Sequence, residues 1–194
     1  MMEQRTAEWY AVRAGKLTAS EAHTIATNGK GLETLVYATL AEKYANEKNE
    51  HYMSLDMLRG VELEEQARQT YELLYSPVQE VGFIEMDEYT GCSPDGLVVD
   101  DGGLEIKCPN NEKYFRMMVN GAQEIEKKYL WQCQMSLLVS GRKWWDLCFF
   151  NPNFDDSLLV FRQERDGEMQ EKLMVGILKG VQMIKNIEEK LCKK

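Results

Sequence analysis

Apolar residues recur at steps of three and four positions early in the chain and again at its end, which predicts amphipathic helices in both regions. One helix is predicted over residues 31–48. Another is predicted over residues 54–75, with Ser54 as its N-cap and Pro77 just beyond its end. A third series predicts a helix over residues 169–191 that closes the chain.

Shorter apolar runs in the middle of the chain are typical of strands. Four such runs follow one another, at residues 80–86, 89–92, 97–99 and 104–108. After them come a helical stretch over 111–119 and 122–139, interrupted at Asn120-Gly121, and two apolar strands over 144–150 and 158–163. Near the N-terminus, Thr18 or Ser20 is expected to cap a short helix that ends near Ala26.

The order of these elements predicts an α/β protein, because helices, strands, a helix, strands and a closing helix follow one another. At 194 residues the chain is long enough for one well-packed domain and too short for two. We therefore expect a single domain over residues 1–194.

Two carboxylates and one ammonium interrupt the apolar pattern of the middle strands. Asp95 lies in a Ser-Pro-Asp-Gly turn sequence, and Glu105 and Lys107 lie in the run Leu-Glu-Ile-Lys. Gly102-Gly103 separates the two stretches, which predicts a hairpin. Because side chains alternate along a strand, Glu105 and Lys107 share one face, where Asp95 can meet them.

Such a cluster is costly to bury unless a metal ion or ligand compensates the charges. Hard oxygen ligands suit Mg²⁺ or Mn²⁺, and a lysine can steer or deprotonate a bound water. The alternative is an ordinary Asp-Gly turn beside a solvated Glu-x-Lys face. The apolar flanks of both stretches favour a buried strand, so we interpret the cluster as a metal-dependent phosphodiesterase site.

Five blocks of sequence, in this order, carry a resemblance to a known family: residues 13–20, residues 59–68 with Glu64, residues 92–97, residues 104–109 and residues 129–134. With them, the region from about residue 9 to about residue 150 resembles the phage lambda exonuclease family, also called the YqaJ-type viral recombinases. This family belongs to the PD-(D/E)xK nuclease superfamily. The resemblance implies a restriction-endonuclease-like core, a mixed central sheet flanked by helices.

The resemblance also implies roles for the clustered residues. Asp95 and Glu105 should ligate the metal, together with the backbone carbonyl of Ile106, and Glu64 should contribute to the metal shell from a helix. Lys107 should position or activate the attacking water. Two Mg²⁺ ions, which Mn²⁺ can replace, are expected about 4 Å apart in each active site. Without the resemblance, Glu64 reads equally well as an exposed carboxylate.

A second set of residues matches family positions that bind a terminal 5′-phosphate. These residues are Arg13, Ser20, Ser93 and Gln132. An arginine fork suits the oxygens of a phosphate, and Gln132 should also lie near the metal site. The alternative for Gln132 is a polar residue on a helix surface. Only Cys192 lies near the C-terminus, which argues against the iron–sulfur branch of the superfamily.

By resemblance, the protein is expected to be a 5′-to-3′ exonuclease acting on double-stranded DNA ends. It should release mononucleotides and leave 3′ single-stranded tails, working as a ring-shaped homotrimer. It should hand the tail to a single-strand annealing protein for recombination, in the cytoplasm of a bacterial host of a phage or prophage. The alternatives are a structure-specific or nicking endonuclease, or a non-catalytic DNA-binding recombination scaffold.

Composition limits other classes of function. No apolar run approaches the roughly 20 residues of a membrane span. The five scattered cysteines fit a reducing compartment, and His23 and His51 lack the spacing of zinc ligands. The net charge of −9 is unusual for a DNA-binding protein, so we expect a basic channel on an acidic body. Trp144 and Trp145 face opposite sides of a strand, so at most one could stack on a base, and core packing is favoured.

Overall fold

The computed structural model describes residues 2–46 and 55–193. Its helices are α1 (Ala7–Arg13), α2 (Ala22–Thr27), α3 (Lys30–Tyr44), α4 (Leu55–Leu74), α5 (Asn111–Asn120), α6 (Lys127–Ser140) and α7 (Gly167–Cys192), with 3₁₀ turns at Ala19–Glu21 and Gly121–Glu124. Its strands are β1 (Leu17–Thr18), β2 (Val78–Gln79), β3 (Ile84–Asp87), β4 (Thr90–Cys92), β5 (Gly96–Val98), β6 (Gly102–Lys107), β7 (Trp144–Phe150) and β8 (Leu158–Glu164).

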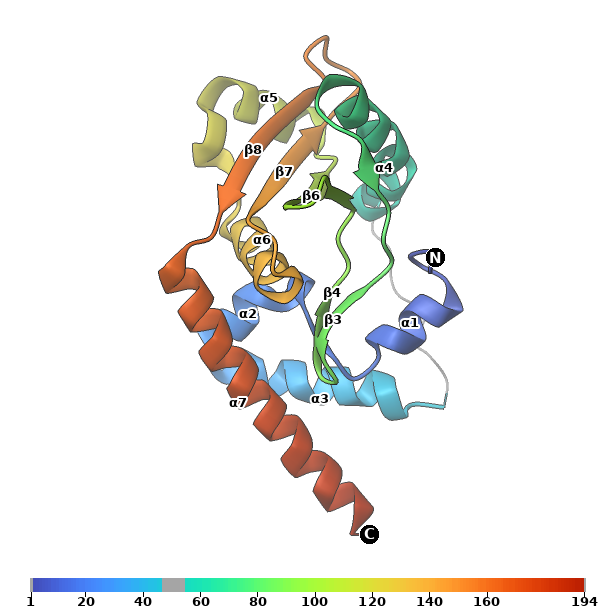
Figure 1. Ribbon diagram of the computed structural model, residues 1–194, viewed down its shortest axis with the longest axis vertical. Helices are drawn as coiled ribbons and strands as arrows, with labels where there is room; N and C mark the ends of the chain where they lie inside the picture. Colours follow the sequence, from blue (N-terminus) through green and yellow to red (C-terminus); the bar gives the residue numbers. More distant parts are fainter. Residues whose placement is uncertain (1, 47–54, 194) are drawn as a thin grey trace.

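A mixed five-stranded sheet in the order β2-β5-β6-β7-β8 forms the upper half of the molecule (Figure 1). The β6–β7 pair is parallel, and the other neighbouring pairs are antiparallel. Because β6 and its neighbour β7 run in parallel, the chain must return from the end of β6 to the opposite end of the strands, and α5 and α6 make this connection.

Alternation along β7 divides the sheet into two packed faces. Cys148 and Phe150 pack on one face with Ala67 and Tyr71 of α4. On the other face, Trp145, Leu147 and Phe149 pack against residues of α5 and α6, including Tyr114, Cys133 and Leu137. The sheet therefore lies between α4 and the α5–α6 connection, which fixes both helices relative to β6.

A second sheet, in the order β1-β4-β3, joins the helices at the other end of the molecule. Buried residues of α2, α3 and α7 pack there with Met135 and Val139 of α6. Helix α7 runs along this side and extends past α3 (Figure 1). No helix in the described ranges is both long and apolar enough to cross a lipid bilayer.

The predicted α/β class, with a mixed sheet flanked by helices, is confirmed. The helices predicted over 54–75 and 169–191 and the strands over 144–150 and 158–163 correspond to α4, α7, β7 and β8. Helix α3 ends at Tyr44, before the predicted end, because Ala45 is extended at φ −69° and ψ 132°. Ser54, the predicted N-cap of α4, lies outside the described residues.

Two local predictions are wrong. Of the strand predicted over residues 80–86, only residues 84–86 form a strand, as part of β3; β2 ends at Gln79, before the predicted range, and belongs to the other sheet. Neither Thr18 nor Ser20 caps a helix with its side chain, because their hydroxyl groups lie 3.0 Å apart and hydrogen-bond each other. The chain enters α2 through a 3₁₀ turn instead.

The predicted hairpin is present, but the glycine pair does not form its turn. Gly102 and Gly103 are the first residues of β6, and the turn lies at residues 99–101. A Cβ atom at either glycine would collide with the ring of Trp144 or Trp145. The pair therefore allows β7 to approach, and the buried Trp145 packs in the core as expected.

Candidate functional site

Strand β6 carries Glu105 and Lys107 on the face that α6 covers. Lys107 Nζ lies 2.6 Å from Glu105 Oε1, and Gln132 Nε2 of α6 donates a hydrogen bond of 2.6 Å to the same oxygen. Glu105 is 2% exposed, and its other oxygen, Oε2, is buried without a hydrogen-bond partner among the described residues. One carboxylate oxygen is thus held by two donors, while the other has none.

Two hydrogen bonds, one made by its backbone and one by its side chain, hold Asp95 beside the same strand. Its N–H donates to the carbonyl of Leu104 at 3.1 Å, and its Oδ2 accepts from the N–H of Ile106 at 2.7 Å. Asp95, Glu105, Lys107 and Gln132 are therefore brought together as the sequence predicted, by the pairing of β5 with β6 and by the packing of α6.

The electrostatics of this cluster favour an additional cation. Burial raises the pKa of the Asp95 carboxyl well above its usual range, and the carboxylates of Glu105 and Glu64 raise it further. Burial also raises the pKa of Glu105, although Lys107 opposes this. Burial lowers the pKa of Lys107, but attraction to Glu105 and Asp95 outweighs it, so the net shift is upward and the amine stays protonated at neutral pH.

A divalent metal ion fits these donors. The unpartnered Oε2 of Glu105 is a buried acceptor that such a cation would satisfy. Across the described ranges, no three His, Cys, Asp or Glu side chains form a complete metal cage. Mg²⁺ sites often use only one or two carboxylates, with water and substrate phosphate as further ligands. Asp95 and Glu105 match that pattern; the carbonyl of Ile106 stays a prediction.

Glu64 lies on α4 and lines the same cleft as Asp95, but its carboxylate is bound by arginines. Arg5 Nη2 donates to its Oε2, and Arg68 Nη2 donates to its Oε1 at 3.4 Å. Glu64 is therefore near enough to raise the pKa of Asp95, but its own carboxylate is paired with arginines.

Arg13 and Ser93 of the predicted phosphate site contact each other. Arg13 Nη1 donates a hydrogen bond of 2.8 Å to Ser93 Oγ, and its guanidinium lies 4.2 Å from the centre of the Trp9 ring. Trp9 Nε1 also donates to Ser93 Oγ at 3.0 Å. No salt bridge joins Arg13 to a carboxylate within the described part of the chain, and burial lowers its pKa. Ser20 lies apart from this contact, bonded to Thr18.

One cleft of about 1360 Å³ connects the two groups of residues. Among the predicted site residues, Arg13, Ser20, Glu64, Asp95, Ile106 and Lys107 line it. Glu105, Ser93 and Gln132 do not line it but hydrogen-bond to each other or to residues that do.

The described lining of this cleft is not basic, because cations and acids are balanced along it, so a basic channel stays a prediction. Its described cations are Arg5, Arg13, Lys16, Lys107, Lys113, Arg116 and Lys128. Its described acids are Glu21, Glu42, Glu64, Asp95, Glu112, Glu124 and Glu126. The cleft is nevertheless less acidic than the whole chain, which carries a net charge of −9.

Sequence reasoning missed Arg5, Trp9 and Tyr129 as contributors to the site. The ring of Tyr129 lies 5.1 Å from Lys107 Nζ, and Trp9 supports both Arg13 and Ser93. Tyr129 is the first residue of one block that carries the resemblance, and Trp9 marks the start of the resembling region. Nothing local in the sequence marks Arg5, which reaches the site only through the tertiary fold.

Comparison with known proteins agrees with this geometry. The sequence model of the YqaJ-like viral recombinase domain matches residues 8–143. The alkaline exonuclease LHK-Exo from Laribacter hongkongensis is similar in structure, with a TM-score of 0.81 at 29% identity over 97% of this chain and 99% of that one. The same values hold for LHK-Exo in complex with dAMP.

A phage-related exonuclease from Haemophilus somnus 129PT shares the fold, with a TM-score of 0.72 at 13% identity over 91% of this chain and 96% of that one. Comparison of the sequence with functionally curated proteins finds no match.

Proposed function

Because the chain belongs to the YqaJ-like viral recombinase family, we propose that it is a Mg²⁺-dependent exonuclease that degrades one strand of double-stranded DNA in the 5′-to-3′ direction. The observation that carries this proposal is the buried Glu105 carboxylate, which has one oxygen held by Lys107 and Gln132 and the other unpartnered beside Asp95. The similarity to an alkaline exonuclease supports the same reaction class. The product is duplex DNA with a 3′ single-stranded tail.

Each residue of the site has a role that its contacts support. Asp95 and Glu105 would bind the metal, and Glu64 would contribute to the metal shell from α4. When bound, Mg²⁺, as one ion or two, would supply charge stabilisation for the phosphate and a more acidic water. Lys107 Nζ, a protonated donor at the edge of the cleft, orients the attacking water and neutralises charge that develops on the phosphate. Gln132 fixes the rotamer of Glu105.

Direction of digestion follows from the phosphate site. Arg13, braced by Ser93 and Trp9, would bind the terminal 5′-phosphate in the cleft, with Ser20, which also lines the cleft, as a further donor; Gln132 would contribute only if its amide left Glu105. This contact would bring the first internucleotide bond to the metal site. After each cut, the new 5′-phosphate moves forward by one nucleotide into the same contact.

We also propose the assembly and partners that the family resemblance implies. These are a ring-shaped homotrimer around the DNA, a single-strand annealing protein that receives the 3′ tail, and action in the cytoplasm of a bacterium that carries the phage or prophage. A ring around the DNA would retain the substrate where a cleft with balanced charges gives little nonspecific attraction.

Light scattering at micromolar concentration should give three times the chain mass, as a homotrimer requires. The mass of a monomer, with and without DNA, would refute the ring.

Linear and covalently closed circular duplexes test the proposed reaction against its alternatives. With Mg²⁺, the linear duplex should be converted to mononucleotides and single strands, while the closed circle should stay intact because it offers no end. Nicking or linearisation of the circle would instead identify a structure-specific or nicking endonuclease. Binding of DNA with neither product would identify a non-catalytic scaffold.

A further inference from the structure

Both oxygens of Glu64 have cationic partners in the metal-free protein. Arg5 binds Oε2, and Arg68 lies 3.4 Å from Oε1. The carboxylate side chain is 14% exposed, so water does not substitute freely for these partners. A divalent cation that approaches Glu64 therefore competes with these arginines for the charge of the same carboxylate.

The two arginines differ in how firmly they are held. The Arg68 side chain is 10% exposed, and it also pairs with Glu65 at 2.6 Å and with Glu80 at 2.9 Å. The Arg5 side chain is 41% exposed, and Glu64 is its one carboxylate partner in the described part of the chain. Arg68 is therefore fixed by three acids, and Arg5 is the partner that can leave.

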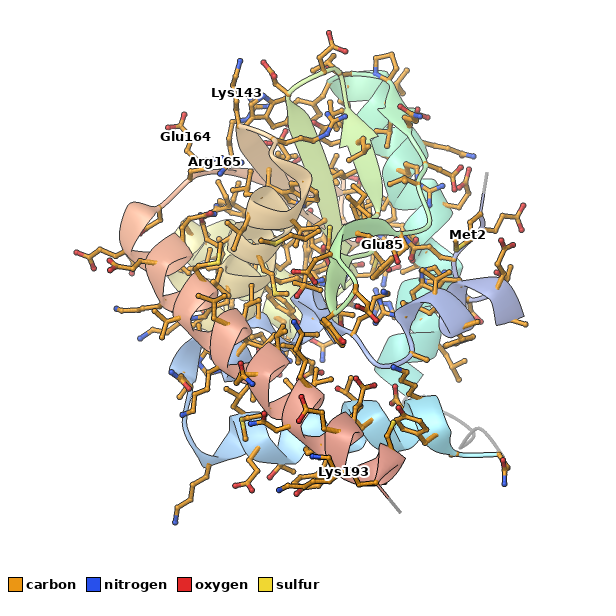
Figure 2. All side chains as sticks on the ribbon, turned by 60° about the horizontal axis from the view of Figure 1, so that its bottom comes forward. Met2, Glu85, Lys143, Glu164, Arg165 and Lys193 are labelled. Atoms are coloured by element: carbon orange, nitrogen blue, oxygen red, sulfur yellow. The ribbon has the colours of Figure 1, made fainter. Side chains whose placement is uncertain are left out.

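Arg5 belongs to a segment that is attached to the site by few contacts. We call residues 2–6 the N-terminal strap; Met2 lies on the side of the molecule where α1 and α4 approach each other (Figure 2). The Gln4 side chain donates to the carbonyl of Pro94 at 2.7 Å and to that of Val81 at 3.3 Å, which holds the strap against the turn before Asp95.

The backbone of the strap is strained at Arg5 itself. Arg5 has a φ of 65°, a left-handed conformation that a non-glycine residue rarely adopts. Such conformations persist where surrounding contacts enforce them, and they cluster at functional sites. The contact of Arg5 with Glu64 and the hydrogen bonds of the preceding residue, Gln4, restrain this conformation. Releasing Arg5 from Glu64 would remove one of these restraints.

Arg5 also stands where two cavities meet. It lines the main cleft, and with Glu64 and Asp95 it lines a smaller cavity of about 370 Å³ beneath the strap. Arg5 therefore borders the same two cavities as Glu64 and Asp95 while its guanidinium holds Glu64 Oε2.

We propose that Arg5 is a tethered competitor of the divalent cation: its guanidinium occupies Glu64 in the metal-free protein and yields that carboxylate when Mg²⁺ binds. This inference rests on the proposed function, since it requires Glu64 to join the metal shell. The strap then couples metal binding to the N-terminus, because movement of Arg5 loosens residues 2–6 from the turn before Asp95.

Titration calorimetry with MgCl₂, without DNA, tests this competition. Arg5→Gln should bind Mg²⁺ about two- to five-fold more tightly than wild type, the factor expected when an exposed ion pair no longer competes. Arg5→Lys, which keeps the charge, should stay near wild type. Arg116→Gln is the matched control, because Arg116 lines the same cleft and pairs with a different acid, Glu124.

The Glu64→Gln background separates direct competition from a general change of charge. There Arg5→Gln should no longer alter Mg²⁺ affinity, whereas a through-space effect would persist and would overturn the inference. Unchanged or weaker binding by Arg5→Gln in the native background would also overturn it. Absence of Mg²⁺ binding in wild type would contradict the proposed metal dependence, and the inference with it.

Discussion

Asp95→Asn should abolish nuclease activity and leave the metal-free protein more stable than wild type. The substitution removes a metal ligand while keeping the size of the side chain, so we expect activity to fall at least about 10³-fold. Asp95→Ala and Glu105→Ala should lose activity similarly. Lys107→Ala should lose about 10²- to 10⁴-fold, because it removes the group that orients the water.

The gain in stability follows from the pKa of Asp95, which burial and neighbouring acids raise. A carboxyl whose pKa is raised by folding destabilises the fold in its charged form. That penalty is absent below the ordinary aspartate pKa and grows as the pH rises through the raised value. At pH 8 in EDTA, Asp95→Asn should therefore unfold at a temperature higher by at least about 2 °C, roughly 1 kcal/mol for a chain of this size.

The matched control is Asp100→Asn in the exposed turn between β5 and β6. It removes the same charge outside the cleft and should change neither activity nor unfolding temperature. Thermal unfolding followed by circular dichroism, together with mononucleotide release from linear DNA, gives both readouts. Wild-type digestion by purified Asp95→Asn would reject the site, and a lower unfolding temperature would reject the electrostatic account.

Arg13→Ala should slow digestion of 5′-phosphorylated ends about 10- to 100-fold, which corresponds to the roughly 1.5–3 kcal/mol of a charge-assisted hydrogen bond. A terminal phosphate carries more negative charge than an internal diester, so a guanidinium beyond the metal site distinguishes the two. In the structure, Arg13 pairs with Ser93 and the Trp9 ring rather than with a carboxylate, so its charge is available to an anion.

Duplexes with 5′-hydroxyl ends are the internal control, because they lack the group that Arg13 should bind. Arg13→Ala should change their slow digestion little. Lys172→Ala on α7, an exposed cation outside the cleft lining, should leave both substrates unaffected. Equal losses on both ends, or no loss on either, would assign Arg13 to general DNA binding or to a structural role.

Residues whose signal is local could be predicted from the sequence. Glu105 and Lys107 stand two positions apart in an apolar strand, and Asp95 precedes the partner strand, so their convergence follows from strand geometry alone. The roles of Arg13 and Gln132 required the family resemblance, because nothing in their neighbouring sequence marks them. Their contacts with Ser93 and Glu105 agree with a shared site but leave the phosphate role a prediction.

Features that depend on tertiary packing could not be predicted. Gly102-Gly103 has the sequence of a turn, but the rings of Trp144 and Trp145 explain the pair. The segment over residues 80–86 is apolar enough for one strand, yet residues 80–83 connect β2 of one sheet to β3 of the other. Arg5 reaches Glu64 across 59 positions of sequence, a contact that no local pattern encodes.

The direction of digestion is a direct test of the proposed 5′-to-3′ exonuclease activity. The substrate is a linear duplex with a 5′-phosphate on each strand and a label on either the 5′-terminal or the 3′-terminal nucleotide of one strand, incubated with Mg²⁺. We expect the 5′ label to appear at once as a mononucleotide, while the 3′ label stays in a long single strand. Early release of the 3′ label, or of labelled oligonucleotides from internal cuts, would contradict it.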